Sequence, residues 1–144
     1  MKVSECMCHQ VSCVNPQTTL SEVAKIMQDK HIGCVPVCDT NKAVVGLVTD
    51  RDIVLRGVAC NKDATTTPVS EIMTTKVNTV TPDSDVYDAG KLMCDCQIKR
   101  VPVIDNNTIV GIITLGDLAN SQATNTGKVC EGICDCGCNS QNNG

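Results

Sequence analysis

Aromatic residues are nearly absent from this chain of 144 residues, which has one tyrosine, Tyr87, and neither tryptophan nor phenylalanine. A core must therefore be built from Val, Ile, Leu and Met, and the 42% of hydrophobic residues is ample for one. The lack of aromatic rings also removes the surfaces on which single-stranded nucleic acid stacks. A net charge of −4 argues against the basic face that a nucleic acid needs. We therefore expect no nucleic-acid partner.

Long apolar runs are missing as well. No segment approaches the roughly 20 apolar residues of a membrane-spanning helix, and the first residues lack the apolar stretch of a secretory signal. We therefore expect a cytoplasmic protein with no membrane partner. In that reducing compartment the 12 cysteines are expected to be thiols or metal ligands before disulfides.

Histidine is scarce, since His9 and His31 are the only two in the sequence. Neither lies in a pattern that combines a nucleophile, a base and an acid that orients the base. We therefore expect that the protein is not an enzyme.

What the chain does contain is an internal repeat, and such a repeat sets the architecture. Residues 44–53 (VVGLVTDRDI) and 109–118 (IVGIITLGDL) both hold an apolar run with one glycine, then a threonine and, three residues later, an aspartate. These copies lie 65 residues apart, whereas the Val-Pro-Val segments at 35–37 and 101–103 lie 66 apart. The slip of one residue falls between the segments, where a turn tolerates it.

The repeat divides the chain into four parts. We expect a first repeat at residues 7–60, a linker at 61–68, a second repeat at 69–120 and a Cys-, Asn- and Gly-rich tail at 121–144, with the first residues as a short lead-in. The linker is polar and without periodicity. The tail has too few apolar residues to offset the entropy lost on ordering, so it is expected to be flexible unless it binds a metal.

Each copy predicts the order strand, helix, strand, strand, helix. In the first copy, Thr19 and Glu22 form a capping-box pattern at the start of a helix. Pro36 has no N–H to donate, so we expect its strand to lie at a sheet edge or to start its ladder there. Strands are expected at 11–14, 34–38, 44–48, 101–104 and 109–113, and helices from 20, over 50–59, from 84 and over 115–120.

This combination resembles the CBS domain (the cystathionine-β-synthase motif), in the tandem arrangement called a Bateman module, of the stand-alone bacterial type. The resemblance rests on the Gly-x-x-Thr-x-x-Asp junctions and the Val-Pro-Val strands, each present twice in register, and covers about residues 7–120. It implies an α/β (α+β) fold of two β-α-β-β-α repeats with pseudo-twofold symmetry, the sheets packed together and the helices outside. It also implies a homodimer.

The resemblance further implies a regulatory module that binds an adenosine nucleotide (AMP, ADP or ATP, or S-adenosylmethionine) in clefts between the repeats. Such a module needs no cofactor and signals through the shape of its dimer or through a partner protein, here unknown. The aspartates implied at the ribose are Asp52 and Asp117, with Thr49 and Thr114 near the ribose or phosphate. Because the family's pockets are built across repeats, residues of the second copy would complete the Asp52 pocket. Those residues are Thr79, Val80, Lys99, Arg100 and Pro102.

The chemistry of the Thr-x-x-Asp motif fits two roles. A carboxylate accepts two hydrogen bonds from the cis-diol of a ribose, and the start of a helix offers N–H groups to phosphate. The same pair also suits a plain helix start, with threonine as the N-cap and aspartate in the first turn. The two roles are compatible, because a vacant site would keep the cap.

The two copies differ where the Val-Pro-Val strand begins. The second copy has Lys99 and Arg100 there, and the first has Gly33 and Cys34. Both cations suit a phosphate, arginine as a planar fork and lysine as a point charge. We therefore expect the Asp52 pocket to take the phosphorylated nucleotide, and the other pocket to be weaker, empty or suited to a less anionic ligand. The alternative is that both cations are solvated loop charges.

The cysteines offer an alternative function, a thiol or metal-binding protein. Thiolates suit Zn²⁺ or Cu⁺, but C-x-C spacing is less specific than paired C-x-x-C. We therefore assign no metal site and keep the tail cysteines as candidates: Cys130, Cys134, Cys136 and Cys138. Four cysteines of the first copy are expected to serve as small apolar residues: Cys13, Cys34, Cys38 and Cys60.

Overall fold

The computed structural model describes residues 1–121 of the chain. The tail expected at 121–144, with its four candidate metal ligands, lies outside the described residues apart from its first position. The chain forms two compact units. Unit A comprises residues 11–77, and unit B comprises residues 1–10 together with the described residues 78–121.

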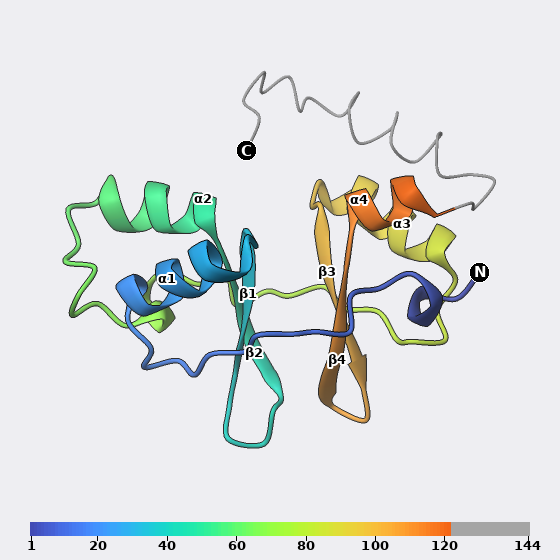
Figure 1. Ribbon diagram of the computed structural model, residues 1–144, viewed down its shortest axis with the longest axis horizontal. Helices are drawn as coiled ribbons and strands as arrows, with labels where there is room; N and C mark the ends of the chain where they lie inside the picture. The colour runs from blue at the N-terminus through green and yellow to red at the C-terminus, as the bar shows by residue number, and fades with distance from the viewer. Residues whose placement is uncertain (122–144) are drawn as a thin grey trace. The chain divides into compact units, whose positions relative to one another are not determined.

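Unit A is built around one β-hairpin and its helices (Figure 1). The hairpin consists of β1 (Cys34–Cys38) and β2 (Val44–Thr49), which pair antiparallel. Helix α1 (Leu20–Lys30) precedes it and packs against β1. The predicted capping box is confirmed, because Thr19 accepts a hydrogen bond from Glu22 N and the Glu22 carboxylate accepts one from Thr19 N.

Unit B repeats this arrangement with the second copy (Figure 1). Helix α3 (Val86–Cys96) precedes an antiparallel hairpin of β3 (Arg100–Asp105) and β4 (Thr108–Thr114). Helix α4 (Leu115–Asn120) follows β4 directly and contacts it. The prediction of a mixed helix and strand fold with two tandem repeats is therefore confirmed.

The predicted slip of one residue lies in the hairpin turns. In unit A the pairing ends at Cys38 and Val44, whereas in unit B it continues to Asp105 and Thr108. The longer turn is held by the Asp39 carboxylate, which accepts hydrogen bonds from Asn41 N at 2.8 Å and Ala43 N at 3.0 Å. Away from the turns, the strands of the two hairpins pair in the same register. The threonine and aspartate of each copy therefore occupy equivalent positions.

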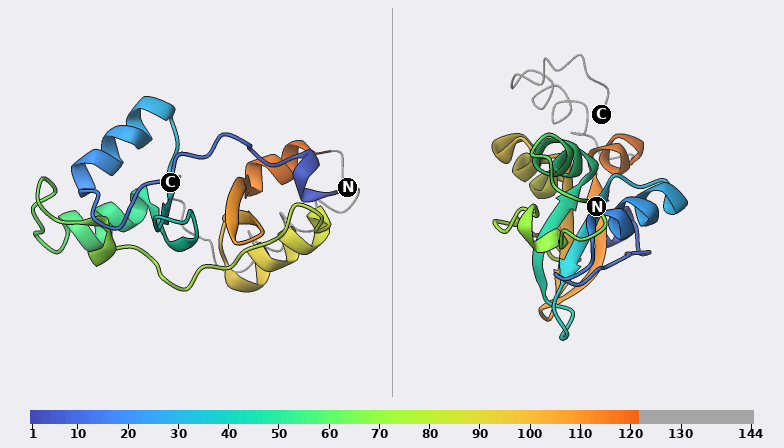
Figure 2. Two further views of the ribbon diagram at one scale, coloured as in Figure 1. Left: turned by 90° about the horizontal axis from the view of Figure 1, so that it is seen from below. Right: turned by 90° about the vertical axis from the view of Figure 1, so that its left-hand side faces the viewer.

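Each hairpin is covered by a short segment that precedes the other copy in the sequence. In unit A, Leu47 exchanges two backbone hydrogen bonds of 2.9 Å with Thr74, which follows the 3₁₀ turn η3 (Val69–Glu71). In unit B, Ile112 exchanges two of 2.9 and 3.1 Å with Cys8, which follows η1 (Val3–Glu5). The N-terminal segment, blue in Figures 1 and 2, thus lies beside β4.

This pairing shows that the repeat begins earlier than the sequence pattern indicated. The residues Val3-Ser4-Glu5 match Val69-Ser70-Glu71, 66 residues later, and both triplets form a 3₁₀ turn. Residues 1–10, expected as a lead-in, are therefore a structural part of unit B. The segment is too short for periodicity to reveal, and its backbone partners lie 78 (Ser4 to Pro82) to 104 (Cys8 to Ile112) positions away in the chain.

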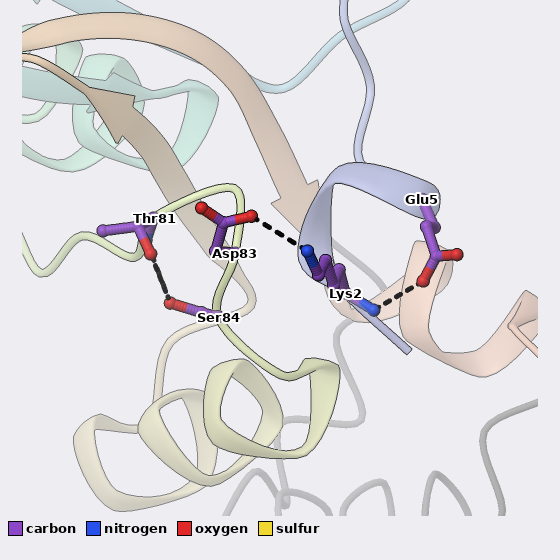
Figure 3. Close-up of polar contacts among 5 residues, drawn as sticks. All are labelled: Lys2, Glu5, Thr81, Asp83 and Ser84. Atoms are coloured by element: carbon purple, nitrogen blue, oxygen red, sulfur yellow. Dashed lines mark hydrogen bonds and ion pairs between the residues drawn. The ribbon is translucent and has the colours of Figure 1, made fainter.

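The start of the chain is fixed to the segment that leads into α3 (Figure 3). Val3 N donates to Ser84 O at 2.8 Å, and Ser4 N donates to Pro82 O at 3.1 Å. The Lys2 ammonium forms an ion pair with Asp83 at 3.2 Å, but both side chains are exposed and such pairs contribute little to stability. The backbone bonds and the burial of Val3 therefore hold this segment in place.

Each unit has its own aliphatic core, as the lack of aromatic residues requires. The buried residues of the unit B core are Val3, Met7, Val86, Ala89, Met93, Val101, Val103, Ile113 and Leu118. Those of the unit A core are Val14, Leu20, Val23, Met27, Val35, Val37, Val48, Val69 and Ile72. In the described part of the chain no helix is both long and apolar enough to cross a membrane.

Two predicted elements differ from the structure. The strand expected at 11–14 is reduced to a single parallel bridge between Val14 and Val37. The helix expected over 50–59 is α only in α2 (Asp50–Asp52) and continues as a π-helix over Ile53–Val58. A buried glycine within it, Gly57, allows close packing on α1, since an added Cβ would lie 3.0 Å from Leu20 Cδ1.

The packing of the N-terminal segment predicts a cost for a side chain at Gly111. A Cβ there would lie 2.7 Å from Met7 Sδ and 2.8 Å from the backbone Cys8 O. Because the backbone cannot rotate away, we expect Gly111→Ala to lower the free energy of unfolding by about 1–3 kcal/mol in urea denaturation. Gly116→Ala is the matched control, with its nearest contact at an ordinary 3.6 Å, and should be neutral or slightly stabilising. Equal stability of the two variants would contradict the packing of residues 1–10 in unit B.

Candidate functional site

The junction between β2 and α2 places Thr49 and Asp52 together by two reciprocal hydrogen bonds. Thr49 Oγ1 accepts from Asp52 N at 3.1 Å, and Asp52 Oδ2 accepts from Thr49 N at 3.0 Å. Extended backbone at Thr49, with φ −111° and ψ 162°, aims its hydroxyl at the first turn. The carboxylate is therefore held in place by the backbone of the residue that precedes the helix.

The junction between β4 and α4 has the same geometry in unit B. Thr114 Oγ1 accepts from Asp117 N at 3.1 Å, and Asp117 Oδ2 accepts from Thr114 N at 2.9 Å. The backbone angles at Thr114 are φ −111° and ψ 163°, almost those of Thr49. All four side chains are partly exposed. Since the cap uses only Oδ2, the second oxygen of each carboxylate is not required for it.

The two basic residues at the start of β3 have their backbone next to the Thr114–Asp117 junction of unit B. Arg100 is the register partner of Thr114 across the hairpin. Lys99 O accepts a hydrogen bond of 2.8 Å from Leu115 N, the first residue of α4. The register thus places the backbone of both basic residues beside this threonine.

Three further residues of the predicted nucleotide site belong to the same unit. Val80 N donates to Pro102 O at 3.1 Å, and Ile104 N donates to Val80 O at 2.8 Å. Thr79 immediately precedes Val80. Unit B therefore contains seven of the nine predicted residues: Thr79, Val80, Lys99, Arg100, Pro102, Thr114 and Asp117. That Thr79, Val80, Lys99, Arg100 and Pro102 complete the Asp52 pocket stays a prediction, because it joins residues of different units.

The equivalent place in unit A has no cation from the strand. Cys34 is the register partner of Thr49, and Gly33 O accepts from Asp50 N at 3.0 Å. The nearby Arg56 donates from Nη1 to Ile72 O at 3.2 Å. The copies thus share the threonine and aspartate but differ in the charge that accompanies them.

Cys6 is a neighbour of the Asp117 carboxylate that sequence reasoning missed. Burial raises the pKa of the Cys6 thiol, and the negative charges of Asp117 and Glu5 raise it further. Its sulfur donates to Val3 O at 3.7 Å. The position corresponds to Ile72 of the first copy, so extending the repeat to residue 3 would have found it.

Metal ligands do not cluster in residues 1–121. There, no group of three or more His, Cys, Asp or Glu side chains is arranged to hold a metal ion. The last three residues of α3, Cys94-Asp95-Cys96, also carry possible ligands, but they form no such group.

Comparison with known proteins gives a clear match over both copies. The model of the family described as the CBS domain matches residues 3–58 and 69–123. Both matches begin at a 3₁₀ turn, η1 or η3, in agreement with the extended repeat.

Individual relatives cover most of the chain. CBS domain-containing protein YhcV of Bacillus subtilis is 42% identical over 123 residues, which cover 85% of this chain and 86% of that protein. A crystal structure of Hypoxic Response Protein I with two coordinated zinc ions matches with a TM-score of 0.79 and 31% identity, covering 85% of this chain and 100% of that chain. The CBS domain pair of protein MJ0100, in complex with 5-methylthioadenosine and S-adenosyl-L-methionine, matches with a TM-score of 0.76 and 29% identity, covering 83% and 93%.

The capping role of Thr114 can be measured without any ligand. Thr114→Ala removes the acceptor for Asp117 N, so we expect the free energy of unfolding to fall by about 1 kcal/mol in urea denaturation. Thr114→Ser keeps the hydroxyl and should retain most of that stability. If both variants lose the same amount, the contribution comes from the threonine methyl group and not from the cap.

Proposed function

This chain belongs to the CBS domain family, and we propose that its two repeats form a regulatory module that binds an adenosine nucleotide and catalyses no reaction. The observation that carries this proposal is the pair of Thr–Asp junctions, each of which fixes a carboxylate and leaves one oxygen outside the cap. That oxygen is suited to accept from ribose hydroxyls. The adenosine compounds bound by the pair of MJ0100 support the ligand class.

We assign the phosphate to Lys99 and Arg100 and the ribose of the same nucleotide to Asp52. The assignment across repeats rests on the family resemblance, in which the second copy completes the pocket of the first. A single unit offers a competing arrangement, because Arg100 is paired with Thr114 in its own hairpin. The two arrangements make opposite predictions for the two aspartates.

The output of the module is proposed to be the shape of a homodimer or the binding of a partner protein. In support, the π-helix that follows Asp52 exposes Val54, Leu55 and Val58, at 54%, 48% and 65% of their surface. Apolar side chains grouped on one helix are typical of a surface that contacts another protein. Because this helix continues directly from the Thr49–Asp52 junction, a ligand there is well placed to influence it.

Metal binding is the second candidate function, and one observation favours it. The structural relative Hypoxic Response Protein I holds two coordinated zinc ions. Since residues 1–121 contain no cluster of three or more ligands, the tail cysteines named above are the candidates that stay open.

Calorimetry with AMP distinguishes the two ribose carboxylates. We expect Asp52→Ala to weaken AMP binding tenfold or more, because hydrogen bonds to a charged group contribute about 1.5–3 kcal/mol, and Asp117→Ala to have a smaller effect. The control is Asp50→Ala, an exposed neighbour whose carboxylate accepts only from the adjacent Arg51 N. A double-mutant cycle with Arg100→Ala should show coupling to Asp52. Coupling to Asp117 in place of Asp52 would assign the site to unit B alone.

A thermal-shift series with AMP, ATP, S-adenosylmethionine and Zn²⁺ separates the two functions. A ligand that binds only the folded protein raises its unfolding temperature by mass action. We expect stabilisation by at least one adenosine compound at millimolar concentration. A response to zinc alone would favour the metal-binding function and count against the nucleotide sensor.

A further inference from the structure

Two cysteines of unit A lie on neighbouring backbone segments although 25 positions separate them in the sequence. Cys13 immediately precedes Val14, and Cys38 immediately follows Val37, its bridge partner. Val14 N donates to Pro36 O at 3.1 Å, and Cys38 N donates to Val14 O at 2.8 Å. The bridge therefore keeps the segment that carries Cys13 against the end of β1.

The side chains of this pair interact and differ in accessibility. Cys38 is buried, with 5% of its surface exposed, whereas Cys13 is exposed. Burial, a hydrogen bond with Cys13 and the charge of Cys13 raise the pKa of Cys38 to about 12. Both are free thiols in the structure. Three other thiols have backbone partners instead, since Cys6, Cys8 and Cys60 donate to carbonyl oxygens.

We propose that Cys13 and Cys38 form a reversible disulfide when the protein meets a small disulfide oxidant such as glutathione disulfide. The proposal is independent of nucleotide binding. It revises the expectation that both residues serve only as small apolar side chains. The corresponding positions of the second copy are Thr79 and Ile104, so the pair is particular to unit A.

The reaction proceeds in two thiol–disulfide exchanges. The exposed Cys13 thiolate attacks a sulfur of the oxidant, which forms a mixed disulfide and releases one glutathione thiolate. This step removes the Cys13 charge that favours the protonated form of Cys38. Cys38 then loses its proton to solvent and attacks the Cys13 sulfur, which expels the second glutathione. The protein gives up two electrons and two protons, and the oxidant becomes two thiols.

The disulfide would add a covalent link between β1 and a segment that few other interactions hold to it. The segment at 11–14 was expected as a strand, but it is held to β1 only at Val14. A disulfide between residues 13 and 38 encloses α1 and most of β1 within one loop, so it restricts the unfolded chain. We therefore expect the oxidised protein to unfold at a temperature several degrees higher than the reduced protein.

Peptide mapping of the full chain tests the pairing. The reduced protein is incubated with glutathione disulfide, free thiols are alkylated, and the protein is digested with trypsin without reduction. We expect the peptides 3–25 and 31–42 to be linked, with a mass lower by two hydrogen atoms than their sum, and fragmentation to place the link at Cys13 and Cys38. Dithiothreitol should release both peptides.

Variants of single cysteines test whether the link requires Cys13 and not another cysteine of the same two peptides. Cys13→Ser, at an exposed position, should abolish both the link and the rise in unfolding temperature, whereas Cys8→Ser in the same peptide and Cys34→Ala in the other should retain them. The proposal is overturned if Cys13 accumulates as a mixed disulfide with glutathione while Cys38 is alkylated. It is equally overturned if the link runs through Cys6, Cys8 or Cys34.

Discussion

The reciprocal hydrogen bonds between a threonine and an aspartate, at the point where a strand becomes a helix, are the constraint on which the candidate site depends. The N-cap hydroxyl and the first-turn carboxylate fix one another through backbone N–H groups. The carboxylate is thereby oriented before any ligand arrives, which lowers the cost of binding. In the proposed function, stability and ligand recognition therefore use the same two residues, and neither role excludes the other.

The short segment that opens each copy of the repeat packs against the hairpin of the other copy. The 3₁₀ turn before the second copy packs on the hairpin of the first, and the N-terminal turn packs on the hairpin of the second. Glycines at 46 and 111 permit the close approach, because an added Cβ would meet Met73 or Met7. Each compact unit thus combines the helices and hairpin of one copy with the opening segment of the other copy.

The two copies share a framework and differ in the chemistry attached to it. Where unit B has Lys99 and Arg100 beside its threonine, unit A has Gly33 and Cys34. Where unit B has Thr79 and Ile104, unit A has the interacting thiols of Cys13 and Cys38. Both copies therefore have the capped junction, but unit B adds two basic residues to it and unit A has a pair of thiols elsewhere, at the end of β1 and on the segment beside it.

The sequence by itself determined the features that short spacings encode. Thr19 and Glu22, or Thr114 and Asp117, are three residues apart, so their caps follow from local geometry, and the hairpins follow from apolar runs around polar turns. The family resemblance named the candidate site residues. Only the tertiary structure decided that Met7 packs at Gly111, that Cys6 lies near Asp117 and that Cys13 meets Cys38. These contacts join residues far apart in the chain, and no local periodicity records which distant segments a folded backbone brings together.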